Sequence, residues 1–161
     1  MTFSNKFIAQ SAIIAALYAA LTIVLAPISY GPIQVRISEM LTVLPFLAPS
    51  AIVGLPIGCI VANIYGGLGI YDIVFGSLCT LIAAVLTYFL GKIKKPILAP
   101  LPPVVVNAFG VSLYLHFLFK MPYFLTVSYI ALGETIACYV LGYPLLRLIL
   151  SNDKLKDMVK L

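Results

Sequence analysis

Five polar residues that could bind a ligand lie inside stretches of sequence that are otherwise almost continuously apolar. Arg36 and Glu39 stand three residues apart in QVRISEMLTVLPF, and Asp72, Asn107 and Glu134 follow in later apolar runs. An ionisable group at the centre of a membrane costs about 2.5–3.5 kcal/mol on insertion scales, so such groups usually face a protein interior and mark a ligand or ion path. We therefore consider these residues candidates for a binding site.

Four of the five also have a plausible structural role. Arg36 and Glu39 could form an ion pair between positions i and i+3 at a helix end. Asp72 could cap a helix, and Asn107 could hydrogen-bond to a neighbouring helix. Glu134 is the hardest to explain structurally, because no basic residue lies within a helical turn of it.

The composition places the chain in a membrane. Of its 161 residues 63% are hydrophobic and 9% are charged, with a mean hydropathy of +1.14, whereas soluble domains have about 25% charged residues. We expect one membrane-embedded domain over residues 1–161. The sequence has no phosphate-binding GxxxxGK[ST] loop. It has one histidine and no nucleophile paired with a base, so we predict neither an enzyme, nor a metal site, nor a cofactor.

Glycine and proline divide the chain into six apolar segments, and a membrane-spanning helix needs about 20 apolar residues. The segments are Phe7–Ile28, about Val35–Leu47, Ser50–Tyr65, Tyr71–Leu90, Pro96–Phe119 and Phe124–Leu150. The second is short, and the prolines at the start of the fifth predict a kink or a late beginning. The sequence therefore predicts an all-α integral membrane protein with six transmembrane helices.

The basic residues predict the orientation of these helices. Six crossings put both termini on one side, and cytoplasmic segments carry an excess of Lys and Arg. With cytoplasmic termini, the inside would hold Lys6, Lys92, Lys94, Lys95, Arg147, Lys154, Lys156 and Lys160. Only Arg36 and Lys120 would lie outside. We attribute the net charge of +5 to this topology and predict no nucleic-acid partner.

The orientation gives each candidate a depth in the bilayer. The outer half would hold Arg36, Glu39, Asn63, Tyr71 and Asp72. Glu134 comes about ten residues into the sixth helix, which is about 15 Å at 1.5 Å per residue and close to the midplane. Asn107 would lie at a similar depth. These seven residues form the predicted substrate-binding set.

The first helix carries a stripe of small residues. At 3.6 residues per turn its alanines fall within an arc of about 140°. The stripe consists of Ala12, Ala15, Ala16, Ala19 and Ala20, with Ala9 at its start. Small residues at such spacing allow a second helix to approach closely. The second helix could belong to this chain or to another membrane subunit, for which the stripe would be a docking face.

Three regions resemble the queuosine-precursor transporter family. They are QVRISEMLTVLPF, GIYDIVFGSLCTLIAAVLTY, and PPVVVNAFGV with the later GETIACYVLGYPL, and the resemblance extends over about Ala9–Leu146. It implies an S component of an energy-coupling factor transporter in a prokaryotic plasma membrane. Such a component has six helices, a substrate pocket near the outer face, and a complex with a transmembrane coupling subunit and two cytoplasmic ATPases. The implied substrates are queuosine precursors, which are 7-deazaguanine bases.

The candidate residues suit such a ligand chemically. A guanine-like edge presents a ring N–H beside an amino group, and Glu134 could accept both in a charge-assisted, bidentate contact. Asn107 can donate to the carbonyl and accept from the adjacent ring nitrogen. An aminomethyl form of the base is cationic and would need a second acid, Glu39 or Asp72. Arg36 would orient Glu39 at the outer rim of the pocket.

Two other functions remain open at this stage. The chain could be a stand-alone secondary transporter coupled to protons through Glu134, although the absence of an internal repeat argues mildly against it. It could also be an assembly protein without a small ligand, which the acids of the outer half disfavour. The alanine stripe favours a binding subunit that obtains its energy from partners.

Overall fold

The computed structural model describes residues 4–30 and 35–159, and within these ranges the chain is helical with no β-strand. The helices are α1 (Asn5–Val24), α2 (Ala26–Ser29), η1 (Ile37–Phe46), α3 (Ser50–Gly66), η2 (Asp72–Gly76), α4 (Ser77–Gly91), η3 (Pro96–Leu98), α5 (Leu101–Phe119), α6 (Tyr123–Thr135), η4 (Ile136–Gly142), α7 (Tyr143–Ser151) and α8 (Asp153–Val159). Of these, η1 and η3 are 3₁₀ helices, and η2 and η4 are π-helical segments inside longer helices.

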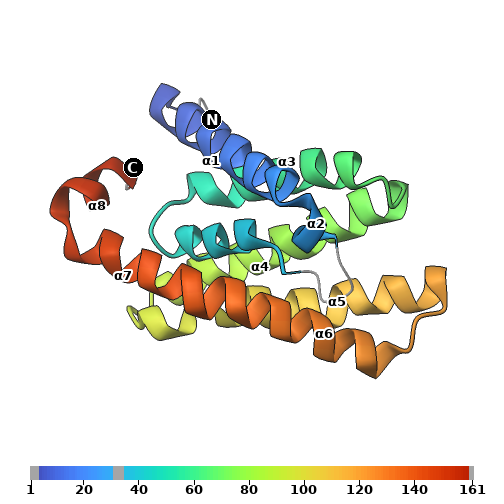
Figure 1. Cartoon of the computed structure of the whole chain (residues 1–161). Helices are drawn as coiled ribbons and strands as arrows, with labels where there is room; N and C mark the ends of the chain where they lie inside the picture. The colour runs from blue at the N-terminus through green and yellow to red at the C-terminus, as the bar shows by residue number, and fades with distance from the viewer. Residues whose placement is uncertain (1–3, 31–34, 160–161) are drawn as a thin grey trace.

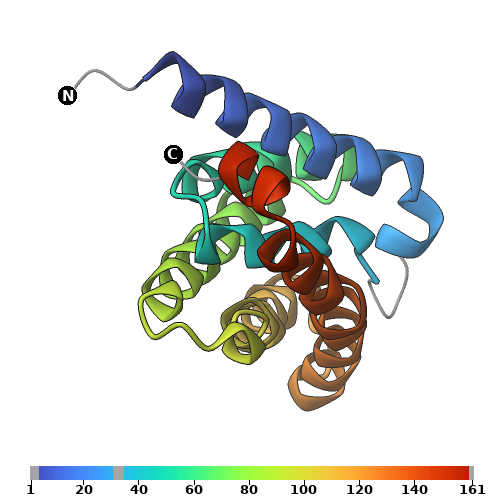
Figure 2. The same ribbon diagram turned by 90° about the vertical axis from the view of Figure 1, so that its left-hand side faces the viewer.

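The long helices run back and forth between two ends of one bundle (Figure 1). Seen along the bundle, α1 crosses one side, α4, α5 and α6 gather on the other, and η1 lies between them (Figure 2). The packing agrees with this view, because η1 contacts α1, α3, α4, η4 and α7. The centre of the bundle is therefore built around a short 3₁₀ helix.

Within the described part of the chain, four helical runs are long and apolar enough to cross a membrane: Asn5–Val24, Asp72–Gly91, Pro96–Phe119 and Tyr123–Ser151. The two shorter apolar helices are η1 and α3. The all-helical membrane fold is thus confirmed, whereas the count of six crossings stays a prediction. At about 2.0 Å per residue, the ten residues of η1 extend about 20 Å, less than the roughly 30 Å of the hydrocarbon core.

Two glycines let α1 and α3 approach each other closely. A Cβ atom on Gly54 would lie 2.6 Å from the carbonyl oxygen of Ser11, and one on Gly58 would lie 2.7 Å from that of Ala15. Both distances are too short for any side chain. Glycines four residues apart are a common means of close helix packing in membranes, and here they bring α3 against the inner side of α1.

The prolines of the fifth segment act as predicted. Pro96 begins the 3₁₀ turn η3, and the regular helix α5 starts only at Leu101, with Pro102 and Pro103 in its first turn. Proline is tolerated there because the first N–H groups of a helix have no intrahelical partner.

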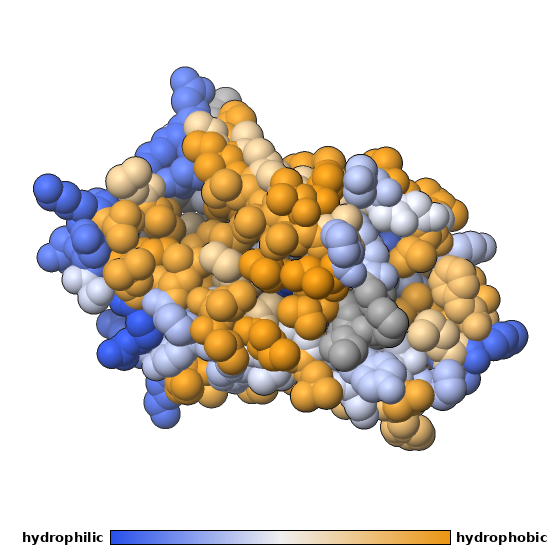
Figure 3. All heavy atoms as spheres, in the orientation of Figure 1, coloured by the Kyte–Doolittle hydropathy of each residue, from blue (hydrophilic) through white to orange (hydrophobic). Residues whose placement is uncertain are grey.

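The outer surface matches a bilayer environment. Large apolar side chains such as Val24, Ile64, Phe117 and Phe124 are more than half exposed. Figure 3 shows a broad apolar surface with the hydrophilic residues gathered toward the ends of the molecule.

The first and last helices meet at one end of the bundle. The side-chain amide of Gln10 donates to the carbonyl oxygen of Met158 at 2.7 Å, and Lys6 Nζ donates to that of Asp157 at 3.4 Å. Helices α1 and α8 are seen together at this end in Figure 1. A chain that crosses the membrane an even number of times must have both termini at the same end of the bundle, as observed here. That this end faces the cytoplasm stays a prediction.

Candidate binding site

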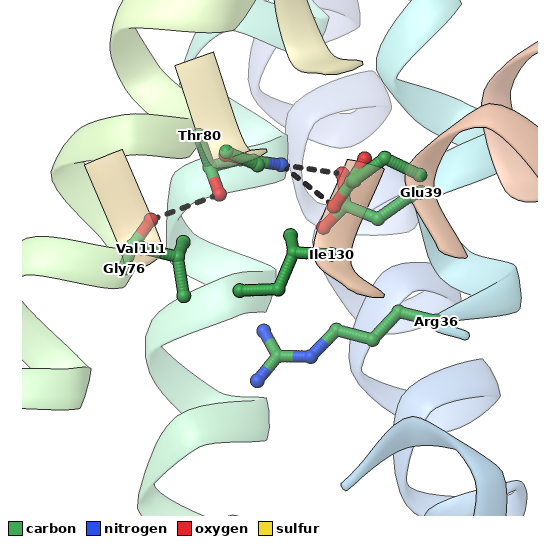
Figure 4. A pocket seen from close by; sticks show the side chains of 8 residues that line it. Arg36, Glu39, Gly76, Thr80, Val111 and Ile130 are labelled. Carbon is green, nitrogen blue, oxygen red and sulfur yellow. Dashed lines mark hydrogen bonds between the residues drawn. The ribbon is translucent and has the colours of Figure 1, made fainter. Parts of the chain in front are cut away.

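A cavity inside the bundle brings together four of the predicted residues from three parts of the chain (Figure 4). It is lined by Arg36, Glu39, Gly76, Thr80, Asn107, Val111, Ile130 and Glu134. Its free volume is about 10 Å³, which is enough for about one water molecule. Thr80, Val111 and Ile130 are additions that sequence reasoning missed, because nothing distinguishes them from ordinary helix-packing residues.

The two carboxylates of the cavity are bridged by one amide. Asn107 Nδ2 donates to Glu134 Oε1 at 3.0 Å and, more weakly, to Glu39 Oε2 at 3.5 Å. The three side chains are 2% to 5% exposed. Asn107 Oδ1 is buried and accepts no hydrogen bond from the described residues. Asn107 therefore joins neighbouring helices by hydrogen bonds, as the sequence allowed. Its Oδ1 atom could in addition accept a hydrogen bond from a ligand.

Other side chains contact the oxygens of the two carboxylates that Asn107 leaves free. Tyr18, on α1 and fully buried, donates its hydroxyl to Glu39 Oε1. Cys138 Sγ lies 3.5 Å from Glu134 Oε2 and 3.4 Å from the backbone oxygen of Glu39. Cys138 belongs to the π-helical segment η4, one turn after Glu134. Every carboxylate oxygen of the cavity therefore has a polar partner in this structure.

Arg36 supplies the positive charge of the cavity. Its side chain reaches into the cavity beside Ile130 (Figure 4), and its guanidinium carbon lies 5.4 Å from the centre of the Tyr30 ring. Within residues 4–30 and 35–159, Arg36 forms no ion pair with Glu39, and its Nε is buried without a hydrogen-bond partner. The ion pair that the sequence allowed is not observed, so the guanidinium keeps its capacity to bind another group.

Asp72 and Asn63 form a second polar cluster with Tyr114, a residue that sequence reasoning missed. The Tyr114 hydroxyl donates to Asp72 Oδ1 at 2.5 Å, and Asn63 Nδ2 donates to the backbone oxygen of Asp72 at 2.9 Å. Asp72 makes no side-chain capping bond and is 2% exposed. It is a buried acid and not the interfacial cap that the sequence also allowed.

Tyr71 does not line the cavity and makes no hydrogen bond in the second polar cluster. It is 53% exposed, and its ring stacks on that of Phe75 with the centroids 6.3 Å apart. Neighbouring helix residues point in different directions, so Asp72 turns inward while Tyr71 turns outward. Of the seven predicted site residues, four line the cavity, two form the second cluster and Tyr71 faces outward.

The alanine stripe divides into two sides. Ala12, Ala16 and Ala20 are exposed, whereas Ala19 is buried and Ala15 is half-buried where Gly58 of α3 approaches. A shallow groove between α1 and α3 is lined by Phe7, Ile8, Ser11, Ala12, Ala15, Val53 and Ile57. One side of the stripe thus packs inside the molecule, and the other is available to a second protein.

The cavity presents hydrogen-bond acceptors and donors that could contact a polar ligand. The cavity offers carboxylate and amide acceptors beside one guanidinium, in apolar surroundings. Among the described residues, no group of three or more His, Cys, Asp or Glu could hold a metal ion. Fold and site together define a multi-pass helical membrane protein with a buried polar cavity.

Comparison with known proteins gives the particular family. The family model of the QueT transporter matches residues 8–151. The chain is 33% identical over 142 residues to the queuosine precursor transporter QueT of Lactococcus lactis subsp. cremoris (strain MG1363), which covers 80% of this chain and 83% of the relative. No solved structure matches the chain significantly. The chain belongs to the QueT transporter family, which confirms the resemblance seen in its sequence.

Proposed function

We propose that this protein is the substrate-binding membrane subunit of an energy-coupling factor transporter and that it binds 7-deazaguanine bases. The observation that carries the proposal is the grouping of Glu134, Asn107, Glu39 and Arg36 around one cavity. The relative from Lactococcus lactis, described as a queuosine precursor transporter, supports this class of ligand.

The guanine-like edge of such a base fits Glu134 and Asn107. The edge has two adjacent donors, a ring N–H and an amino group, next to a carbonyl acceptor. Glu134 can accept both donors, which makes a charge-assisted pair. Asn107 Nδ2 can then donate to the ligand carbonyl instead of to Glu134. The ligand would thus take the place of the present bond from Asn107 to Glu134, and both side chains would keep a hydrogen-bond partner.

The closed cavity implies a change of shape on binding. A free volume of about 10 Å³ cannot hold a bicyclic base, since small-molecule sites are typically about 300–1,000 Å³. For a base to enter, the hydrogen bond from Asn107 to Glu134 would have to break. The side chains of Arg36 and Ile130 line the space that the base would then occupy. The structure described here would thus be a closed form of the site.

The exposed side of the alanine stripe would dock a transmembrane coupling subunit. Ala12, Ala16 and Ala20 would let a partner helix approach α1 closely, and two cytoplasmic ATPases would complete the complex. The protein would have six membrane crossings and cytoplasmic termini, in a prokaryotic cell membrane.

Calorimetry on the purified protein tests the ligand class. We expect 7-deazaguanine bases to bind, and 7-deazaadenine, which lacks the paired N–H and amino donors, to bind at least about a hundredfold more weakly, as expected when two buried contacts are lost. Equal affinity for both bases would overturn the proposal. Uptake by this chain alone in proteoliposomes, driven by a pH gradient, would show instead a stand-alone proton-coupled transporter.

A further inference from the structure

The second polar cluster contains two buried oxygen atoms that lack partners. Asp72 Oδ2 and Asn63 Oδ1 accept no hydrogen bond from the described residues, although Asn63 is fully buried and Asp72 nearly so. An unpaired buried acceptor typically costs about 1–3 kcal/mol, so two in one cluster need an explanation. Both atoms are acceptors, and the group that would satisfy them is therefore a donor.

The cluster adjoins the central cavity across a single glycine. Gly76 lines the cavity. A Cβ atom on Gly76 would lie 2.8 Å from Asn63 Nδ2, 3.6 Å from Tyr114 Oη and 3.8 Å from Asp72 Oδ1. Any side chain at position 76 would press against the cluster, whereas glycine lets the cluster lie directly beside the cavity. A ligand in the cavity could therefore reach the cluster with a short substituent.

We propose that Asp72, Asn63 and Tyr114 form a subsite for a positively charged amine on the ligand. A primary ammonium has three N–H donors. The cluster provides Asp72 Oδ2, Asn63 Oδ1 and the remaining acceptor capacity of the Tyr114 hydroxyl. The carboxylate matches the charge, and a charge-assisted contact is about twice as strong as a neutral one.

Glu39, the other acid available to the amine, is already occupied. Its two oxygens accept from Tyr18 and Asn107, and it shares the cavity with the Arg36 guanidinium. An ammonium at Glu39 would have to compete with these donors. At Asp72 it would gain acceptors that are unused.

The separation of the two clusters fits the shape of an aminomethyl base. The 2-amino group belongs to the six-membered ring, and an aminomethyl group at C7 projects from the five-membered ring, next to the carbonyl and far from the 2-amino group. A base held at its N–H and amino donors by Glu134 would direct the amine past Asn107 and away from Glu134. The inference rests on the proposed function and assigns each end of the ligand to one cluster.

Calorimetry with two matched ligands tests the subsite: 7-aminomethyl-7-deazaguanine and its neutral analogue 7-methyl-7-deazaguanine. We expect the wild-type protein to prefer the amine, and Asp72→Asn to reduce this preference at least about tenfold, since a charge-assisted bond is lost. Tyr114→Phe should reduce the preference less, and it provides a second variant should Asp72→Asn fail to fold. Asp153→Asn, in the exposed helix α8, should leave both affinities unchanged.

The outcomes separate this inference from the function on which it rests. An Asp72→Asn protein that keeps the wild-type preference overturns the subsite and leaves the proposed function standing. If Glu39→Gln loses the preference for the aminomethyl ligand while Asp72→Asn keeps it, the amine binds at Glu39. That result also overturns the subsite. If the folded wild-type protein binds neither base, both the proposed function and the subsite are overturned.

Discussion

The central cavity and the exposed alanines of α1 are the two regions on which the proposed function depends, and they are built in opposite ways. The cavity consists of buried polar groups that hydrogen-bond to one another through Asn107. The surface of Ala12, Ala16 and Ala20 has no polar side chain and is exposed. The first region can recognise a ligand only by exchanging hydrogen bonds, whereas the second can bind a partner by shape alone.

Because of this difference, ligand specificity would depend on the cavity and assembly with a partner would depend on the alanine surface. Leaving a buried polar group unpaired is costly, so the cavity accepts only ligands that replace its internal bonds. Packing of small residues has no such requirement and tolerates any helix of fitting shape. Substitutions in the two regions should therefore affect different measurements, although Ala16 and Tyr18 are two residues apart on one helix.

The largest expected effect is an all-or-none labelling pattern that tests where the alanine surface lies. In intact cells, a membrane-impermeant thiol reagent should label Lys120→Cys and leave Lys94→Cys unlabelled, because the proposed topology places position 120 outside and position 94 in the cytoplasm. Cys59, Cys79 and Cys138 are buried and should give little background. Labelling at position 94 from outside would invert the topology and place the alanines on the wrong side for an ATPase complex.

Ala16→Leu should abolish uptake while leaving ligand affinity nearly intact. The larger side chain would hold a partner helix away from α1, so we expect uptake by the whole transporter to fall at least about tenfold. Calorimetry on the isolated protein should show an unchanged affinity. Val140→Leu, at a position 61% exposed on η4, is the matched control and should leave both quantities unchanged. Equal losses of binding and uptake in Ala16→Leu would mean that the surface packs internally.

Glu134→Gln should weaken ligand binding at least about tenfold, and a loss of about a thousandfold or more is consistent with the energies involved. The change keeps the shape but puts an N–H donor where the ligand presents its own donor. It removes a charge-assisted bond worth about 1.5–3 kcal/mol and leaves a donor unpaired at about 1–3 kcal/mol, and 1.4 kcal/mol corresponds to a factor of ten.

A double-mutant cycle that combines Glu134→Gln with a change in the ligand tests whether Glu134 binds the guanine-like edge. A ligand without the 2-amino group should lose much more affinity for the wild-type protein than for Glu134→Gln, since both changes remove the same contact. Thermal unfolding checks that the variant is folded. If the losses of binding free energy from the two changes are additive in a folded variant, another acid must bind the guanine-like edge of the ligand.

Tyr18→Phe should give the smallest effect, which we expect on stability. It removes the hydroxyl that supports Glu39, so the free energy of unfolding should fall by about 1.5–3 kcal/mol. Chemical denaturation in detergent measures this change. Tyr129→Phe, at an exposed position, is the matched control and should be neutral. A Tyr18→Phe protein as stable as the wild type would show that Glu39 does not depend on α1.

The sequence was sufficient to predict the helical membrane fold and the polar residues that meet in the cavity. Polar groups in apolar helices are scarce, and each must find an interior partner; Glu39, Asn107 and Glu134 accordingly meet. Tyr18 could have been recognised by the same reasoning, because a tyrosine in the middle of an apolar helix needs a partner for its hydroxyl.

The helix types and the orientation of Tyr71 could not be predicted in this way. The 3₁₀ helix η1 and the π-helical segments η2 and η4 depend on packing within the bundle and have no distinct sequence pattern. They decide which residues point inward, so Asp72 enters the bundle while Tyr71 faces outward. Thr80 and Ile130 gave no signal either, since such residues are common in apolar helices.

The hydrogen bond from Tyr18 to Glu39 has a thermodynamic consequence for transport. It joins the helix that would carry the docking surface to a carboxylate of the cavity. If a ligand strengthens or breaks this bond, it changes the free energy with which α1 takes up its docked position. Linkage is reciprocal, so docking must then change ligand affinity by the same factor. A partner that binds α1 would thus help to release the ligand to the same degree that the ligand weakens docking.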